Sequence, residues 1–255
     1  MKSTGSTSST PTAAEAGGKR GSAASLDEVI NELVAANRIL YHQGVMDAYG
    51  HVSTRHPHMP DAFLIASGKA PALVSPDHII ELDLNGREIR GVPQSLYLER
   101  FIHAEIYRAR PDVGAVVHSH SPSVLPFSVV PTVPLRPICH MSGFLSLGAP
   151  VFEIRDAAGD GSDLLISTPQ LGQALAATLG SRAVVLMRGH GSTVVGNNLR
   201  EAVFQAIYTE INARLQREAL ALGAPVFLTA QESAACVATV SATMDRAWNL
   251  WIDQI

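Results

Sequence analysis

Two histidines, His118 and His120, stand two positions apart at the end of the apolar run GAVVHSH, residues 114–120. This run predicts a β-strand, in which alternate side chains project to one side, so the two imidazoles would lie about 7 Å apart on the same face. Two imidazoles held in this way can bind one metal ion. The alternative interpretation is a solvated or hydrogen-bonded histidine pair on an edge strand.

A carboxylate and a third imidazole are candidates for the same ion. Glu99 and His103 are four positions apart in the helix predicted just before the strand, and therefore share one helix face. His190 stands between two glycines after another apolar run, where the backbone can approach a ligand closely. Three imidazoles and a carboxylate suit zinc, manganese or iron. For His103, a place in the core or behind the ligands is the favoured interpretation.

The elements that would carry these residues are both strands and helices. A Ser-x-x-Glu capping box at residues 25–28 predicts a first helix that runs to about residue 44. From residue 50 to about 84 the pattern changes to short strands, and Asn85-Gly86 predicts a hairpin turn with positive φ at both central residues. Mixed strands and helices without internal repeats predict a single α/β domain.

The second half of the chain continues this pattern. Apolar spacing predicts two helices and two strands, at about 98–110, 169–179, 114–120 and 183–187. Asn197-Asn198 predicts the start of a long helix and Gly223 its end. The apolar face expected for this helix comprises Val203, Ile207, Ile211 and Leu215. Beyond residue 225 we expect a terminal helix in which Trp248 and Trp251 pack in the core.

Composition excludes several classes of protein. The 255 residues carry a formal net charge of −4 without a basic stripe, which argues against nucleic-acid binding. The sequence shows no apolar run near the roughly 20 residues of a membrane helix and no signal peptide. Only two cysteines, Cys139 and Cys236, favour a reducing compartment, so we expect a cytoplasmic protein. Residues 1–24 almost lack large apolar side chains and predict a disordered leader before a domain at 25–255.

Longer stretches of the sequence resemble the class II aldolase/adducin family over about residues 26–225. The segments that carry the resemblance are GHVSTRHP, LIASGKAPALVSPDHI, LERFIHAEIYRARPDVGAVVHSHSP and LMRGHGSTVVGNNLREAVFQAIYTEINARLQ. The resemblance implies a three-layer α/β/α fold with a central, mostly antiparallel sheet. It implies one divalent ion per subunit, of manganese, zinc or iron, with His118, His120 and His190 as ligands. Glu99 would be the fourth ligand or the acid/base, and the family commonly forms homotetramers with active sites between subunits.

The sequence departs from the sugar-phosphate aldolases of this family at the expected substrate site. Tyr97-Leu98 stands where those enzymes carry a Ser-Ser pair, and SGKAPALVS replaces a Thr- and Gly-rich loop. A phosphate would lose most of its hydrogen-bond donors there. Cys139-His140-Met141 stands where such aldolases carry a tyrosine proton donor, and methionine cannot deliver a proton. The aromatic, apolar and cationic replacements resemble a branch of hydroxylated-aromatic and pyridine-dicarboxylate decarboxylases.

This resemblance suggests roles for further residues. Glu99 and His51 are the candidate catalytic residues, and either of them or a metal-bound water could protonate the ring carbon after carbon dioxide departs. Lys69 and Arg55 are candidates to bind a second carboxylate. For Lys69 a solvated loop lysine is the favoured interpretation, and for Arg55 the cap of a strand end is an equal alternative. Tyr208 lies in the long helix, where it is either a core residue or part of a substrate site in a neighbouring subunit.

Three hypotheses of function follow. The leading one is a metal-dependent decarboxylase of a hydroxylated aromatic or heteroaromatic (di)carboxylic acid, which takes a small-molecule substrate and works as a homotetramer without nucleic-acid or membrane partners. The second keeps the metal site but performs aldol cleavage of a non-phosphorylated hydroxy acid, or iron(II)-dependent oxidative decarboxylation or oxygenation of a hydroxyphenyl substrate. The third is a non-catalytic adducin-like binding module, which has no physical need for four converging ligands.

Overall fold

In the computed structural model of the chain, residues 1, 25–90 and 95–255 are described, so the predicted leader lies outside the described residues apart from Met1. Their strands form an eight-stranded sheet in the order β4-β3-β2-β1-β5-β8-β7-β6. The strands are β1 His51–Arg55, β2 Ala62–Ala66, β3 Ile79–Asp83, β4 Glu88–Arg90, β5 Ala115–Ser119, β6 Val151–Phe152, β7 Val184–Met187 and β8 Gly191–Gly196. Neighbouring strands pair antiparallel except β6 and β7, which are parallel. The predicted mostly antiparallel sheet is confirmed.

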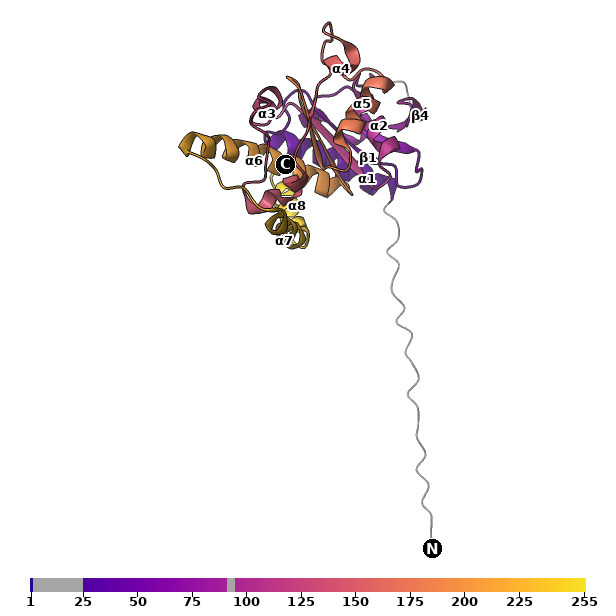
Figure 1. Cartoon of the computed structure of the whole chain (residues 1–255). Helices are drawn as coiled ribbons and strands as arrows, with labels where there is room; N and C mark the ends of the chain where they lie inside the picture. The colour runs from indigo at the N-terminus through magenta and orange to yellow at the C-terminus, as the bar shows by residue number, and fades with distance from the viewer. Residues whose placement is uncertain (2–24, 91–94) are drawn as a thin grey trace.

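Helices cover both faces of the sheet. Helices α1 (Leu26–His42) and α6 (Leu199–Leu222) share one apolar core with the sheet, and α2 (Arg100–Ala109) and α5 (Pro169–Leu179) share the other. Figure 1 shows α2 and α5 on one side of the sheet and α6 on the opposite side. Because residues of each strand alternate between the two cores, β5 sends Val117 to one and Val116 to the other. The three-layer α/β/α class is confirmed.

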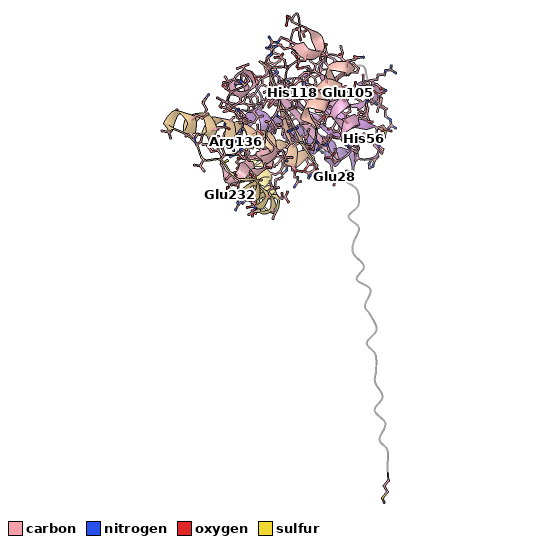
Figure 2. The ribbon with its side chains drawn as sticks, viewed as in Figure 1. Glu28, His56, Glu105, His118, Arg136 and Glu232 are labelled. Carbon is pink, nitrogen blue, oxygen red and sulfur yellow. The ribbon has the colours of Figure 1, made fainter. Side chains whose placement is uncertain are left out.

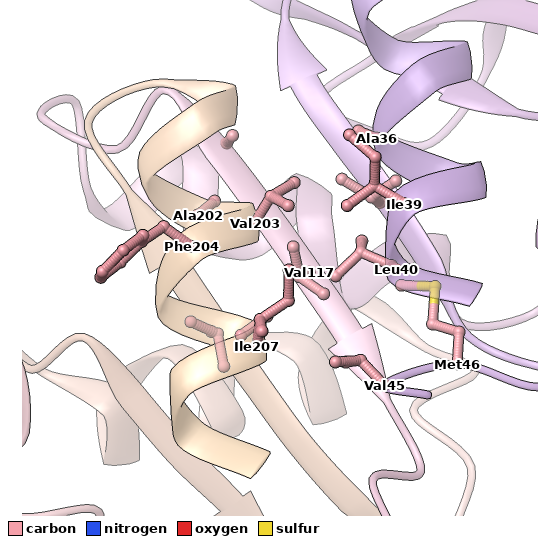
Figure 3. Close-up of a cluster of buried hydrophobic side chains, with 14 of the residues drawn as sticks. Ala36, Ile39, Leu40, Val45, Met46, Val117, Ala202, Val203, Phe204 and Ile207 are labelled. Carbon is pink, nitrogen blue, oxygen red and sulfur yellow. The ribbon is translucent and has the colours of Figure 1, made fainter. Parts of the chain in front are cut away.

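The core on the α1 and α6 side joins distant parts of the chain. Figure 3 shows Ile39 and Leu40 of α1, Val117 of β5, and Val203 and Ile207 of α6 gathered in one cluster between the two helices. Burial of each such aliphatic side chain stabilises the fold by roughly 1.5–3 kcal/mol. This packing holds β5, and with it the histidine pair, in the middle of the molecule.

Local signals explain where the helices begin and end. Ser25 and Glu28 form the predicted capping box, and the Asn198 side chain accepts the amide of Glu201 at 2.9 Å at the start of α6. Helix α6 ends at Gly223, as predicted. Its expected apolar face is only partly buried: Val203 and Ile207 lie in the core, whereas Leu215 is 37% exposed because the helix extends beyond the sheet.

The Asn85-Gly86 hairpin is confirmed between β3 and β4, with one correction to the turn. Gly86 has φ of +71°, but Asn85 does not adopt positive φ. The loop is longer than a two-residue turn, and the Asp83 carboxylate accepts the backbone amides of Asn85 and Arg87 at 2.8 and 2.9 Å. This side chain supplies the hydrogen bonds that a tighter turn would draw from the backbone.

Shorter helices fill the rest of the described chain. They are η1 Pro71–Leu73, η2 Pro76–His78, α3 Leu125–Val129, η3 His140–Leu147, α4 Arg155–Ala158, α7 Ala230–Ser241 and α8 Met244–Ile252. Trp248 and Trp251 of α8 are buried against the core of α1 and α6, which confirms the expected packing. Across the described residues, every helix is too short or too polar to cross a membrane.

Candidate metal centre

Sheet register brings the three candidate histidines together. His118 is the penultimate residue of β5 and His120 follows the strand, while His190 lies in the turn between β7 and β8. Strands β5 and β8 pair directly, with Ser119 opposite Ser192. Figure 2, in which His118 is labelled, shows this residue within the body of the fold and away from Arg136 and Glu232.

A glycine makes this close approach possible. Gly191 has φ of +154°, and a Cβ atom placed on it would lie 2.1 Å from the backbone oxygen of Ser119. A side chain at this position would therefore push β8 away from β5 and carry His190 away from His120. The second glycine of the Gly-His-Gly sequence is thus a packing requirement of the site as well as a turn signal.

The four predicted ligands converge on one point. The Oε2 atom of Glu99 lies 3.6 Å from Nε2 of His118 and 3.5 Å from Nε2 of His190. The Nε2 atoms of His118 and His120 are 3.3 Å apart. Two ligands bound at about 2.1 Å to one ion at tetrahedral angles are about 3.4 Å apart. These distances therefore fit a single transition-metal ion such as zinc, manganese or iron.

Backbone carbonyls orient two of the rings toward that point. The Nδ1 atom of His118 donates to the carbonyl of Ser192 at 3.1 Å, and Nδ1 of His190 donates to the carbonyl of Leu164 at 3.0 Å. A carbonyl oxygen can only accept, so each ring carries its hydrogen on Nδ1 and keeps the Nε2 lone pair free. Free Nε2 lone pairs that face one another and a carboxylate are the donor set that a cation needs.

The segment around Leu164 supports both a histidine and the carboxylate. Leu164 has φ of +70°, a left-handed conformation that is costly for a branched side chain, and it directs its carbonyl at His190. Two residues later, the amide of Ile166 donates to Oε1 of Glu99 at 2.9 Å. Sequence reasoning missed this segment, because a backbone group that orients a ligand has no residue-type signature.

Burial opposes charge on the residues of the cluster. Burial raises the pKa of Glu99, while His190 and the Ile166 amide oppose that rise. Burial also lowers the pKa of His120, and that of His118 falls well below its usual range. His118 and His120 are therefore neutral and able to donate lone pairs, and a bound cation would favour the ionised form of Glu99.

An open cavity of about 350 Å³ lies against the cluster. Its wall is formed by the residues Ala48, Tyr49, Gly50, His51, Gly68, Lys69, Ala70, Tyr97, Leu98, Glu99, His120 and Leu165. This volume suits a single substituted ring. Burial raises the pKa of the Tyr97 hydroxyl to about 12, and this group donates to the carbonyl of Lys69, which ties the SGKAP loop to the wall.

Of the other predicted site residues, the structure brings His51 and Lys69 to this cavity. His51 is buried at the start of β1, directly opposite His118 in the sheet, and its ring centroid lies 5.0 Å from that of His118. Lys69 is exposed and lies in the loop on the cavity wall. Tyr49 and Leu165 also form part of this wall, and sequence reasoning did not single them out.

The structure does not bring Arg55 to the site. Arg55 lies at the other end of β1, where its guanidinium donates to four backbone carbonyls, at 2.7–3.2 Å. These acceptors are the carbonyls of Pro60, Tyr107, Arg110 and Val113. A guanidinium engaged in this way serves the fold, so the expected substrate contact of Arg55 is not supported and the strand-end interpretation holds.

Tyr208 and His103 also lie outside the cavity wall. Tyr208 packs on Phe204 of the same helix, with ring centroids 4.5 Å apart, next to the core of α1 and α6. His103 lies within α2, whereas Glu99 is the residue that precedes the helix and has φ and ψ of −87° and 17°. The two side chains therefore do not project in parallel, and His103 contacts His51 rather than the metal ligands.

The fold and this cluster define a family. Residues 31–217 match the class II aldolase and adducin N-terminal domain, and the chain belongs to that family. Among solved structures, an L-fuculose 1-phosphate aldolase superposes with a TM-score of 0.72 at 22% identity, covering 87% of this chain and 100% of that one. An aldolase II superfamily protein from Pseudomonas syringae has a TM-score of 0.71 at 26% identity, covering 89% and 91%.

Curated relatives include both decarboxylases and aldolases. The chain is 35% identical over 249 residues to the decarboxylase tropJ of Talaromyces stipitatus, which covers 89% of this chain and 93% of the relative. It is 30% identical over 210 residues to a 3,4-dihydroxyphthalate decarboxylase of Arthrobacter keyseri, covering 75% and 78%. An L-fuculose phosphate aldolase of Escherichia coli is 28% identical over 218 residues, covering 82% and 90%.

Proposed function

We propose that this protein is a divalent-metal-dependent decarboxylase of a hydroxylated aromatic or heteroaromatic (di)carboxylic acid. The observation that carries the proposal is the convergence of Glu99, His118, His120 and His190 beside a ring-sized cavity with an aromatic and apolar wall. The similarity to decarboxylases, one of which acts on a dihydroxyphthalate, supports the choice of reaction and substrate class.

The residues of the cluster would hold one ion of manganese, zinc or iron per subunit. Such an ion, when bound, would polarise a ring hydroxylate and its neighbouring carboxylate and stabilise the charge left by departing carbon dioxide. The apolar wall at Leu98 and Leu165 would exclude water from one side of the ring, and Tyr97 would contact its face. Lys69 would bind a second carboxylate at the open side of the cavity.

The reaction needs one proton for the ring carbon that loses its carboxyl group. Glu99 is the proposed donor, since it lies at the edge of the cavity beside the cluster and could act as the acid in a step in which it does not bind the ion. The Ile166 amide holds Oε1 of Glu99, which leaves Oε2 toward the cluster. His51 borders the same cavity and is the second candidate to contact the reacting ring.

We also propose a homotetramer of one domain spanning residues 25–255, with active sites near subunit interfaces. The far end of α6 supports an assembly, because Leu215, Leu220 and Leu222 are exposed there and Leu222 is 92% exposed. Tyr208 lies on the same helix and would be near such an interface. A single domain is supported by the shared core of α1, α6 and α8. Cytoplasmic localisation stays a prediction.

Elemental analysis of the purified protein, paired with carbon dioxide release from a panel of hydroxylated aromatic and pyridine dicarboxylates, tests the proposal. We expect about one metal ion per subunit and release that continues without dioxygen. Metal-free, inactive protein would instead support an adducin-like binding module. Bound metal without release would favour aldol cleavage of a hydroxy acid, and release that consumes dioxygen and needs iron(II) would favour oxidative chemistry.

A further inference from the structure

A chain of four hydrogen-bonded side chains runs from the cavity wall into the core. Nδ1 of His51 lies 2.6 Å from Nε2 of His103, and Nδ1 of His103 lies 2.6 Å from Oγ of Ser53. Oγ of Ser53 in turn lies 2.8 Å from the hydroxyl of Tyr107. All four residues are buried, and His51 is the member that borders the cavity. In such a chain each group can donate a hydrogen bond to the next or accept one from it, and the direction of donation depends on Tyr107, the group at the inner end.

The inner end of the chain is a donor. Burial raises the pKa of the Tyr107 hydroxyl, which therefore keeps its proton. Among the described residues, Ser53 Oγ is the acceptor within hydrogen-bond distance of that hydroxyl. Tyr107 thus donates to Ser53, because otherwise a buried hydroxyl proton would lack an acceptor.

The direction then passes along the chain to His51. Ser53 accepts from Tyr107 and has one hydrogen left, which it donates to Nδ1 of His103. Burial lowers the pKa of His103 to about 3, so its ring is neutral and carries a single hydrogen, on Nε2. That hydrogen is donated to Nδ1 of His51. A neutral His51 that accepts at Nδ1 must carry its own hydrogen on Nε2.

The Nε2 atom of His51 is also the one that is open to a ligand. It makes no hydrogen bond to any described residue, yet it is not closed off from solvent, and the residue borders the cavity. The ring stands between the rings of Tyr97 and His118, with centroids 4.7 and 5.0 Å away. A ring substrate in the cavity would therefore meet an N–H group at this point.

We infer that Tyr107, Ser53 and His103 fix His51 as the tautomer with hydrogen on Nε2, and that this N–H group binds an anionic oxygen, carboxylate or phenolate, of the substrate. The inference rests on the proposed function for the identity of the ligand. His103 and Ser53 are positioning residues that act through His51. In this tautomer His51 neither donates a lone pair to the metal ion nor removes a proton from the substrate through Nε2.

Neutron diffraction from a deuterium-exchanged crystal of the full chain, loaded with Zn²⁺, tests the tautomer directly. We expect nuclear density for deuterium on Nε2 of both His51 and His103, and on the Ser53 hydroxyl pointing to His103. Deuterium on Nδ1 of His51 would overturn the inference. This measurement does not depend on which reaction the protein catalyses, so failure of the proposed function leaves its outcome readable.

A matched pair of variants tests the binding role. His103→Gln supplies an amide N–H that can still donate to His51, whereas the carboxylate of His103→Glu can only accept and would reverse the tautomer. With 3,4-dihydroxybenzoate as the probe in calorimetry, we expect Kd to rise less than about threefold for the glutamine variant and at least about tenfold for the glutamate variant. Metal content and thermal unfolding of both variants establish that the site is intact.

The result that overturns the binding role is an equal change of Kd in the two variants, which would mean that His103 only fills space. Thr209→Val serves as the control for loss of a buried hydroxyl, because Thr209 donates to the Gln205 carbonyl within α6 and lies outside the chain of four residues. This control is expected to retain the Kd of the unmodified protein for the probe.

Discussion

His118 and His190 on one side of the site and His51 on the other differ in the groups that their Nδ1 atoms meet. His118 and His190 donate from Nδ1 to the backbone carbonyls of Ser192 and Leu164. His51 instead meets another imidazole, His103, through its Nδ1. The same side chain therefore offers a lone pair to the cluster in the first case and an N–H group to the cavity in the second, according to the inferred tautomer.

The difference shows how one sheet can present hydrogen-bond acceptors and a hydrogen-bond donor within a few ångströms of each other. A backbone carbonyl always accepts, so it fixes the ring that contacts it whatever residue supplies the carbonyl. Hydroxyl and imidazole groups can donate or accept, so the direction at His51 depends on a series of side chains. The orientation of the His118 and His190 rings, the proposed metal ligands, is thus set by the main chain, and that of the ring on the cavity wall by residue type.

The largest expected effect comes from removing two of the proposed metal ligands. A His118→Ala, His120→Ala double variant removes two of the four converging ligands. We expect metal content to fall from about one ion per subunit to near zero and decarboxylation to fall by roughly 1000-fold or more. Elemental analysis and carbon dioxide release measure both. His42→Ala, which removes an exposed histidine at the end of α1, is the control, and full metal content in the double variant would contradict the assignment.

A smaller effect concerns His103, which contacts His51, and appears as a pH dependence of the free energy of unfolding. Burial lowers the pKa of His103 to about 3, against about 6.5 for an unfolded histidine. Between these values the unfolded chain binds a proton that the folded chain does not, so this residue costs stability as the pH falls below about 6.5, by about 1.4 kcal/mol per pH unit. Above that pH it has no such effect.

The test compares unfolding by urea at pH 7 and pH 5 for the unmodified protein and His103→Gln. We expect the unmodified protein to lose about 2 kcal/mol more than the variant over this interval, because the other titrating groups are common to both. The same pH dependence in both proteins would show that His103 is protonated in the folded state. That result would also contradict the single hydrogen assigned to its ring.

The smallest expected effect concerns a cation that belongs to neither group. Lys69→Met should raise KM by roughly tenfold for substrates with a second carboxylate, since one charge-assisted contact is worth about 1.5 kcal/mol. The metal content should not change. A ring acid without the second carboxylate provides the internal control, and an equal rise of KM for it would show that Lys69 does not bind that group.

Arg55→Gln is the matched cation change, expected to lower the free energy of unfolding without changing KM.

Residue types and spacing were enough to predict which four side chains converge. Alternation along one strand put His118 and His120 on the same side, and a glycine on each side of His190 indicated the close approach that Gly191 makes. These are local properties of short segments. Helix ends with side-chain caps, such as Ser25 and Asn198, were predictable for the same reason.

Other parts of the site depend on contacts between segments that are distant in the sequence. His51 and Arg55 lie on one short strand, and nothing in that pattern says which end faces the cavity. The carbonyl of Leu164 and the amide of Ile166 orient His190 and Glu99, but every residue has such groups. Their direction follows from the path of the backbone, which only the packed fold determines.

The main-chain carbonyls that orient His118 and His190 affect how this protein can evolve. Side chains on the cavity wall, such as Tyr97, Leu98 and Leu165, can be exchanged without removing the carbonyls that hold His118 and His190. Selection for a new ring substrate could therefore alter the wall by single substitutions while the proposed metal ligands keep their orientation. The residues that would select the substrate are thus different from the backbone groups that orient the histidines, so substrate preference could change while the histidine geometry stays the same.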